Sequence, residues 1–494
     1  MSTKITDLEP KEVWKYFLEI TKIPRPSKKE EKIAQYLVDF AKKHKLEHVK
    51  DETGNVLIRK PATKGYENLK IVALQSHMDM VCEKNADKQF DFDKDAIQAY
   101  VDGDWVTADG TTLGADDGIG MATQLAILAA NDIEHGELEC LFTVDEETGL
   151  TGAFGLKPDL LKATILLNLD SEDDGQIFIG CAGGRDTIAK MWFKKELVPD
   201  YAIPFKIAVK GLKGGHSGDD INKGLGNANK ILNRLLHLAT QTYGARLNSF
   251  NGGNLRNAIA REAEAIILVN RAAKEKFIKM VDDFDKTIKN ELHTTEPDVL
   301  VQTFEVDQPY YVIDEKAQRL LILTLYAIPH GVTEMSRDIP NFVQTSTNLA
   351  SVKTFDDYFF ITTSQRSSVA SALDDVVNMV AAVLKLAGAE VEHTDGYPGW
   401  SPNPKSDILQ VSKKSYENLF NEAPKVLAVH AGLECGLIGE TYPKMDMISY
   451  GPELKGVHSP DEKIHIKSVE KFWIWTLDIL KNIPLVNPRY PAAK

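Results

Sequence analysis

Between residues 69 and 175, apolar stretches of strand-like composition repeatedly end in acidic residues or histidine. The stretch 141–149, LFTVDEETG, shows this most plainly, because its apolar run ends in Asp145, Glu146 and Glu147. In open α/β sheets, ligands lie beyond the carboxyl ends of the strands. Acids crowded at such a place repel one another unless a cation or a proton lies among them. Taken alone, the stretch fits a ligand cleft and a solvated acidic turn equally well.

Three further stretches repeat the pattern. Residues 69–75 predict a strand followed by His77 and Asp79, which share one side of an extended chain because they are two residues apart. Residues 164–169 predict a strand that ends in Asp170, and 111–120, TTLGADDGIG, place Asp116 at the start of a helix. A buried histidine, a carboxylate at a helix N-terminus or a polar turn would explain one such end. We predict four successive strand–helix units that bring these residues to one cleft.

Other nucleotide and metal-binding patterns are absent from the sequence. The glycines around Asp116 match neither GxGxxG nor a P-loop, which argues against a nucleotide site. The four cysteines are scattered without a CxxC pair, which argues against a thiolate zinc site or a disulfide scaffold and favours a reducing compartment.

Length and charge narrow the class of protein. A chain of 494 residues predicts two or three domains. Its formal net charge of −14 argues against a nucleic-acid partner, which would need a basic surface. We see neither a signal-peptide pattern nor an apolar run of about 18 residues, so we expect a cytoplasmic protein without a membrane partner.

The pattern of predicted elements changes after residue 184. Up to that point strands and helices alternate, whereas 185–396 show no such order and include GLKGGHSGDD and NGGNLRNAI. The proline-rich stretch YPGWSPNP then marks a return at residue 397. We therefore predict an α/β domain with a mixed, largely parallel sheet flanked by helices, formed by residues 1–184 and 397–494. Residues 185–396 would form an inserted α+β lid domain. Near the N-terminus, residues 27–30 match a capping box that would open a helix.

The polar residues at the predicted strand ends suit a pair of metal ions. Two histidines with several carboxylates suit zinc without thiolates, and two ions about 3.5–4 Å apart need a bridging carboxylate. Five residues complete such a set, with Asp116 as the bridge: His77, Asp116, Glu147, Asp170 and His458. One arrangement places His77 and Asp170 on one ion and Glu147 and His458 on the other, but spacing alone does not determine this pairing.

Two acids remain for other roles. Asp79 would orient His77 through the second ring nitrogen, and Glu146 would take a proton from a water at the metals. Neighbouring residues of an extended chain face opposite ways, so Glu146 and Glu147 should differ in role. Asp145 is then a structural acid at the strand end.

Several motifs together resemble a known family. In chain order, HMD, GADDG, DEETG, LNLDSE, GGHSG and VHSPDE are similar to those of the di-zinc aminoacylase and carboxypeptidase-G-like peptidases. Within that family, NGGNLRNAI and HAGLECG resemble the bacterial aminoacyl-histidine dipeptidases. The resemblance covers nearly the whole chain.

The resemblance implies roles for individual residues. It implies two Zn²⁺ per chain, replaceable by Co²⁺ or Mn²⁺, on the five residues named above, with Asp79 and Glu146 as catalytic acids and a cis peptide bond after Asp116. In the lid domain, it implies that His216 stabilises the reacting carbonyl. It assigns substrate contacts to the following residues: His216, Asn257, Arg366 and Gly432.

The implied function is that of a cytoplasmic dipeptidase. Its substrates would be small peptides, chiefly Xaa-His dipeptides including β-Ala-His, cleaved by a hydroxide on the two zinc ions with Glu146 as the general base. The resemblance also implies a homodimer formed through the lid domain. Two alternatives remain open: a related amidohydrolase that deacylates N-acyl amino acids, and a binding module that keeps the fold without activity.

Overall fold

The chain folds into two compact units. The structure is a computed structural model and describes residues 4–486. The first unit contains residues 4–180, 402–428 and 433–486, and the second contains 181–401 and 429–432. The domain limits predicted at 184/185 and 396/397 differ from these by a few residues. No sequence pattern indicated that the short segment 429–432 belongs to the second unit.

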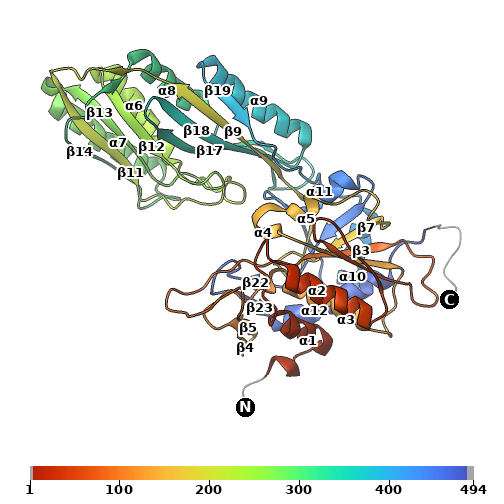
Figure 1. The fold of residues 1–494 in the computed structure, drawn as a ribbon. Coiled ribbons are helices and arrows are strands. Elements are labelled where there is room, and N and C mark those ends of the chain that lie inside the picture. Colours follow the sequence, from red (N-terminus) through yellow and green to blue (C-terminus); the bar gives the residue numbers. More distant parts are fainter. Residues whose placement is uncertain (1–3, 487–494) are drawn as a thin grey trace. The chain divides into compact units, whose positions relative to one another are not determined.

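The first unit is built on an eight-stranded mixed sheet with the order β1-β2-β6-β3-β7-β21-β8-β20 (Figure 1). Its four central strands, β6, β3, β7 and β21, run parallel. Every residue of β3, β6 and β7 is buried, as expected for parallel strands that are covered on both faces. The predicted α/β class is therefore confirmed. The strands are β1 (Glu47–Lys50), β2 (Val56–Lys60), β3 (Val72–His77), β6 (Leu138–Thr143), β7 (Ile165–Asn168), β8 (Gln176–Cys181), β20 (Lys425–Val429) and β21 (Asp446–Ser449).

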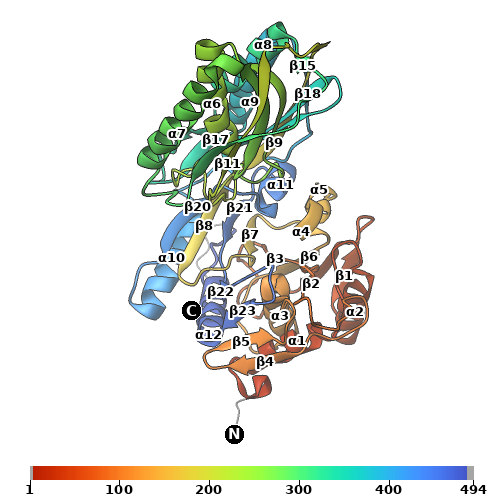
Figure 2. The ribbon, with the colours of Figure 1, turned by 90° about the vertical axis from the view of Figure 1, so that its left-hand side faces the viewer.

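Amphipathic helices pack around this sheet. The first of them, α1, buries Val13, Trp14, Phe17 and Ile20 at helical spacing. The helices are α1 (Lys11–Ile20), α2 (Glu31–Lys43), α3 (Ala115–Ala129), α4 (Glu146–Gly149), α5 (Thr151–Phe154), α10 (Asp407–Phe420), α11 (Glu434–Thr441) and α12 (Ile466–Lys481), with a 3-10 turn at Ile5–Asp7. A second, four-stranded antiparallel sheet lies near α12 (Figure 2). It consists of β4 (Ala99–Asp102), β5 (Trp105–Ala108), β22 (Leu454–Lys455) and β23 (Lys463–His465).

The predicted capping box at residues 27–30 is wrong. Helix α2 begins at Glu31 without a side-chain cap. Instead, the Ser27 hydroxyl donates to Asp79 Oδ2 at 2.7 Å, and Glu30 Oε1 accepts the backbone N–H of Asp145 at 2.9 Å. Both side chains therefore bind residues that follow the central strands, a role that local sequence pattern does not reveal.

The second unit is an α+β unit with a nine-stranded sheet. All its strand pairings are antiparallel, in the order β14-β11-β13-β12-β17-β18-β9-β19, with β16 added to β17. The strands are β9 (Gly183–Trp192), β11 (Ala202–Lys210), β12 (Arg246–Gly252), β13 (Ala263–Asn270), β14 (Leu300–Glu305), β16 (Gly331–Met335), β17 (Val343–Thr354), β18 (Tyr358–Ser367) and β19 (Glu390–His393). A separate pair is formed by β10 (Lys195–Glu196) and β15 (Val312–Ile313).

Helices of the second unit pack on this sheet and share one core with it. In β11, Phe205, Ile207 and Val209 alternate into that core. Helix α6 begins at Ala228, where the Asn227 side chain accepts the N–H of Lys230 and caps the helix. The helices are α6 (Ala228–Tyr243), α7 (Lys274–Glu291), α8 (Glu315–Ala327) and α9 (Ala370–Leu386).

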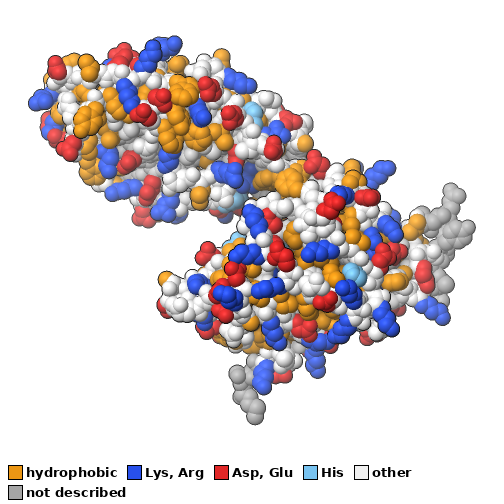
Figure 3. Space-filling view, in the orientation of Figure 1, with side chains coloured by type: hydrophobic (Ala, Val, Ile, Leu, Met, Phe, Trp, Pro, Cys, Tyr) orange, Lys and Arg blue, Asp and Glu red, His pale blue; other side chains and the backbone are white. Residues whose placement is uncertain are grey.

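The surface is charged and mixed. On the face shown in Figure 3, acidic and basic side chains are interspersed over both units. Within residues 4–486, none of the helices is both long enough and apolar enough to cross a bilayer.

Candidate metal and active site

Three neighbouring parallel strands end at the same edge of the first sheet. His77 is the last residue of β3 and pairs with Thr143, the last residue of β6. Gln75 of β3 pairs with Asn168, the last residue of β7. The residues just beyond these ends therefore meet, as the general rule for ligand sites in such sheets predicts.

Asp116 reaches this edge by a different route. The prediction that Asp116 lies at the start of a helix is confirmed. It lies in the first turn of α3, which follows β5 of the four-stranded sheet. Its own φ and ψ are not helical, and the peptide bond between Asp116 and Asp117 is cis, as the resemblance implies.

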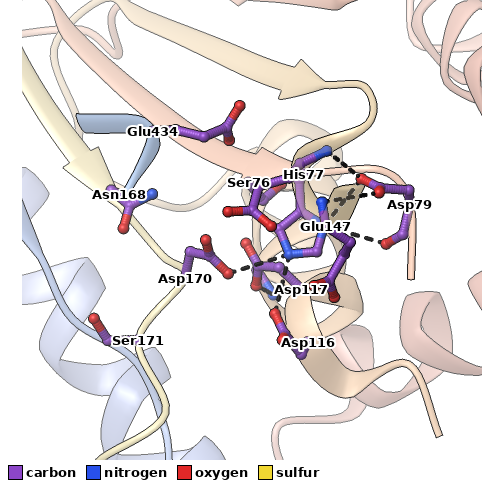
Figure 4. Close-up of polar contacts among 12 residues, drawn as sticks. Ser76, His77, Asp79, Asp116, Asp117, Glu147, Asn168, Asp170, Ser171 and Glu434 are labelled. Atoms are coloured by element: carbon purple, nitrogen blue, oxygen red, sulfur yellow. Dashed lines mark hydrogen bonds and ion pairs between the residues drawn. The ribbon is translucent and has the colours of Figure 1, made fainter. Parts of the chain in front are cut away.

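The carboxylate of Asp116 lies between two histidines. Its Oδ1 is 3.0 Å from His77 Nε2, and its Oδ2 is 3.2 Å from His458 Nε2. His77 Nε2 also lies 3.3 Å from Asp170 Oδ1 (Figure 4), and His458 Nε2 lies 3.0 Å from Glu147 Oε2. The structure thus brings all five predicted ligands together, grouped as in the arrangement considered above.

Asp79 binds both His77 and the segment that follows β6. Its Oδ1 is 3.4 Å from His77 Nδ1, whose nearest acceptor is the Asp79 carbonyl oxygen at 3.2 Å. The carboxylate also accepts the N–H groups of Glu146 at 3.0 Å and Glu147 at 3.2 Å. Burial would raise the pKa of Asp79, but the hydrogen bond and charge of His77, together with the Ser27 hydroxyl, lower it to about 2.

The expectation that Glu146 and Glu147 lie on extended chain is wrong. They form the first turn of α4, and Asp145 before them has a left-handed backbone with φ 52°. Asp145 is buried, and its carboxylate accepts hydrogen bonds from the Thr148 and Thr151 hydroxyls. It therefore closes the turn, in agreement with a structural role.

The charged groups of the cluster shift one another's pKa in opposite directions. Burial raises the pKa of Glu146 and Asp170, and each is raised further by neighbouring acids. Although burial opposes it, hydrogen bonds from both histidines lower the pKa of Asp116. Hydrogen bonds to Asp116 and Glu147 raise the pKa of His458 to about 11. Such crowding of carboxylates is relieved by positive charge placed among them.

The donor set fits divalent metal ions. The ligand atoms of three overlapping triplets lie within 4.8 Å of one another: His77, Asp116 and Asp170; Asp116, Glu147 and His458; and His77, Glu146 and Glu147. Glu147 Oε1 is buried and has no hydrogen-bond partner among the described residues. Imidazole nitrogens with carboxylate oxygens, without thiolates, are the ligands of many zinc sites.

A further buried acid was not singled out from the sequence. Glu434, the first residue of α11, accepts hydrogen bonds on Oε2 from Gln75 at 2.6 Å and from Thr143 at 2.7 Å. Its other oxygen has no partner among the described residues, and burial raises its pKa to about 7. Figure 4 shows it on the far side of Ser76 from Asp79. The available signal was the HAGLECG motif, whose acid we left without a role.

The residues assigned to the lid domain gather within the second unit. His216 Nδ1 accepts the N–H groups of Gly218 at 3.3 Å and Asp219 at 3.2 Å, and its Nε2 lies 3.5 Å from Arg366 Nη2. The carbonyl oxygen of Asn257 accepts the N–H of Ser217, next to His216. These contacts bring Asn257, His216 and Arg366 together.

Tyr397 connects this group to Gly432 and was missed in the sequence. Its hydroxyl accepts a hydrogen bond from Arg366 Nη1 at 2.7 Å. Its ring packs so closely on Gly432 that a Cβ added there would lie 2.8 Å from Cε2. Arg366 is buried, and its Nε–H has no acceptor among the described residues.

Comparison with known proteins identifies the family. The profile of peptidase family M20/M25/M40 matches residues 73–473. The chain belongs to this family. The predicted class, a hydrolase of the metallopeptidase type, is confirmed.

Two proteins resemble this M20 chain over nearly its whole length. The cytosol non-specific dipeptidase of Escherichia coli (strain K12) is 45% identical over 98% of this chain and 99% of its own. The structure of the aminoacylhistidine dipeptidase of Vibrio alginolyticus is 44% identical, with a TM-score of 0.92 over 98% of this chain and 99% of that one. An aminopeptidase from Bacillus cereus, 17% identical with a TM-score of 0.57 over 96% and 99%, shares the fold.

The segment 429–432 of this peptidase contains a histidine that should affect its acid stability. His430 is buried, and its Nε2 lies 2.7 Å from Ser346 Oγ. Burial and then the charge of Arg366 lower its pKa to about 3. The folded chain therefore keeps the imidazole neutral, whereas the unfolded chain protonates it near pH 6.5.

Replacing this residue, as in His430→Gln, should weaken the pH dependence of stability. In the wild type, the free energy of unfolding is unaffected by the protonation of this histidine above pH 6.5. It decreases as the pH falls from 6.5 toward 3, because only the unfolded chain takes up the proton. Between pH 7 and pH 5, the wild-type free energy of unfolding should fall by roughly 2 kcal/mol more than that of the variant. Denaturant unfolding at the two pH values measures this, and an equal fall in both proteins would contradict it.

Proposed function

We propose that this M20 peptidase is a cytoplasmic dipeptidase that cleaves small peptides, with Xaa-His dipeptides, including β-Ala-His, among its preferred substrates. The observation that carries the proposal is the Asp116 carboxylate, each oxygen of which faces one of two histidines. The two full-length relatives support the substrate class, since one is named a non-specific dipeptidase and the other an aminoacylhistidine dipeptidase.

We propose two divalent ions at this site, with zinc as the resident metal and Co²⁺ or Mn²⁺ as substitutes. Asp116 would be a ligand of both ions. His77 and Asp170 would complete the ligand set of one ion, and Glu147 and His458 that of the other. When bound, such a pair polarises a carbonyl and lowers the pKa of water. The supporting evidence is the donor set and the grouping of its distances.

Glu146 is the proposed general base. Its carboxylate would take a proton from the attacking water and deliver it to the leaving amine. Burial and neighbouring acids raise its pKa, which favours holding that proton between the two steps. Asp79 would act by fixing His77 and by holding the backbone of Glu146 and Glu147 through its two N–H contacts.

The second unit is proposed to bind the substrate. His216 would donate a hydrogen bond from Nε2 to the oxygen of the reacting carbonyl, and its Nδ1 lies 3.2 Å from Asp219 Oδ2. Arg366, with an unpaired Nε–H, would bind the free carboxylate of a dipeptide. Asn257 and Gly432 would contact the peptide beside it.

As partners we propose only small peptides and a second copy of the chain, bound through the second unit. The net charge of −14 argues against nucleic acid. Light scattering on a size-exclusion column tests the dimer.

Glu146→Gln should remove turnover while leaving the metals in place. The amide keeps the shape of the side chain but cannot accept a proton, so we expect a loss of about 100-fold or more in kcat. Kinetics on Ala-His and metal analysis of the same preparation measure both quantities. Wild-type turnover in this variant would remove Glu146 from the role of base.

His77→Ala should lower the metal content instead. The change removes a nitrogen donor that faces both Asp116 and Asp170, so fewer than two ions should remain per chain after dialysis. His48→Ala on β1, outside the cluster, serves as the matched control. Two ions retained in His77→Ala would refute this assignment.

A substrate panel separates the proposal from its alternatives. We expect hydrolysis of β-Ala-His and Ala-His, and little hydrolysis of N-acetyl and N-succinyl amino acids, because both full-length relatives are named as dipeptidases. Activity on acyl amino acids alone would favour the amidohydrolase. A chain that binds dipeptides but hydrolyses nothing would favour the binding module.

A further inference from the structure

A buried carboxylate outside the proposed ligand set binds the backbone of the segment that carries Asp116. Glu462 is 2% exposed and accepts four consecutive backbone N–H groups. Its Oε2 accepts from Leu113 at 2.7 Å and Gly114 at 3.0 Å, and its Oε1 from Ala115 at 2.7 Å and Asp116 at 3.4 Å. One side chain thus satisfies all the amides from residue 113 to 116.

These amides need an acceptor that the local sequence does not provide. The first N–H groups of a helix have no partner within the helix, and α3 has Gly114 at its N-cap without a capping side chain. A carboxylate at this end is favoured both by the hydrogen bonds and by the helix dipole. Glu462 provides this carboxylate, although it lies 349 residues after Leu113 in the sequence.

Arg25 binds the same segment through a carbonyl oxygen. This buried guanidinium donates through Nη2 to the carbonyl oxygen of Gly114 and through Nη1 to those of Met78, at 3.0 Å, and Asp79. Gly114 has φ 69°, and a Cβ added there would lie 2.6 Å from Arg25 Nη2. The guanidinium therefore ties the residues after His77 to the residues before Asp116.

Glu462 also belongs to the loop that carries the second histidine. It lies four residues after His458, in the loop between β22 and β23. Within this loop, the N–H of Glu462 donates to the Ser459 carbonyl at 3.1 Å, and the Ser459 hydroxyl donates to Gly456 O at 2.7 Å. A single connected set of hydrogen bonds thus joins the backbone beside His77, Asp116 and His458.

We propose that Glu462 and Arg25 are positioning residues that place the Asp116 carboxylate midway between His77 and His458, so that one carboxylate can serve two metal ions. The inference rests on the proposed metal site. Neither side chain touches the metals or the substrate. They act on the distance between the two halves of the site. Losing them should therefore weaken binding of the second ion more than binding of the first.

The alternative is that Glu462 only stabilises a helix end. Glu139 provides a matched control, because it is also fully buried in the first unit and accepts two backbone N–H groups, from Lys162 at 2.8 Å and Ala163 at 2.9 Å. It has no contact with the ligand set. Glu139→Gln should therefore cost stability without changing metal binding.

The test is a Co²⁺ titration of the metal-stripped full-length chain, followed by visible absorption of the bound ion. We expect the wild type and Glu139→Gln each to bind two ions, and the two affinities of the variant should equal those of the wild type. Glu462→Gln turns an NH₂ group toward backbone donors, and the second ion should bind at least about tenfold more weakly, with an altered spectrum. Glu462→Asp, which keeps the charge, should recover part of this loss.

The possible outcomes separate the two proposals. Wild-type affinity for both ions in folded Glu462→Gln, with stability lowered as in Glu139→Gln, would overturn the positioning role. If Glu462→Gln does not fold, Glu462→Asp and Arg25→Lys decide, and unchanged binding of the second ion in both would overturn it as well. A wild type that binds fewer than two Co²⁺ ions would instead overturn the proposed function.

Discussion

Asp116 offers one carboxylate oxygen to each of two histidines that come from opposite ends of the sequence, and the candidate metal site is arranged around this contact. The distances of 3.0 and 3.2 Å put His77 and His458 on either side of one side chain. Asp170 lies beside His77 at one end of the cluster, and Glu147 lies beside His458 at the other. Carboxylates packed this closely are costly to bury without positive charge, which is why the cluster is best explained as a metal centre.

The buried acids around this contact divide into two kinds. The acids of the first kind direct their oxygens at the histidines. The acids of the second kind bind backbone N–H groups of the segments that carry the first. Asp79 holds the turn that carries Glu146 and Glu147, Glu462 holds the start of α3, and Glu30 holds Asp145. The arrangement of the site is therefore set by the backbone as much as by the ligand side chains.

The residues proposed to bind the substrate lie in the second unit. There Arg366 links His216 to Tyr397, and Tyr397 packs on Gly432. Gly432 belongs to a short segment of the second unit, whereas Glu434, two residues later, is buried in the first. One motif of seven residues, HAGLECG, therefore contributes to both units.

The sequence by itself determined the α/β class, the strands that end in polar residues and the five candidate ligands, because buried parallel strands are apolar and their ends are not. The resemblance added the residues of the second unit. Tertiary structure decided the rest: the turn at α4, and the contacts that Glu434 makes with Gln75 and Glu462 makes with Leu113. Hydrophobic periodicity is a local signal, whereas these contacts join residues more than 340 positions apart and exist only once the sheet and helices have packed.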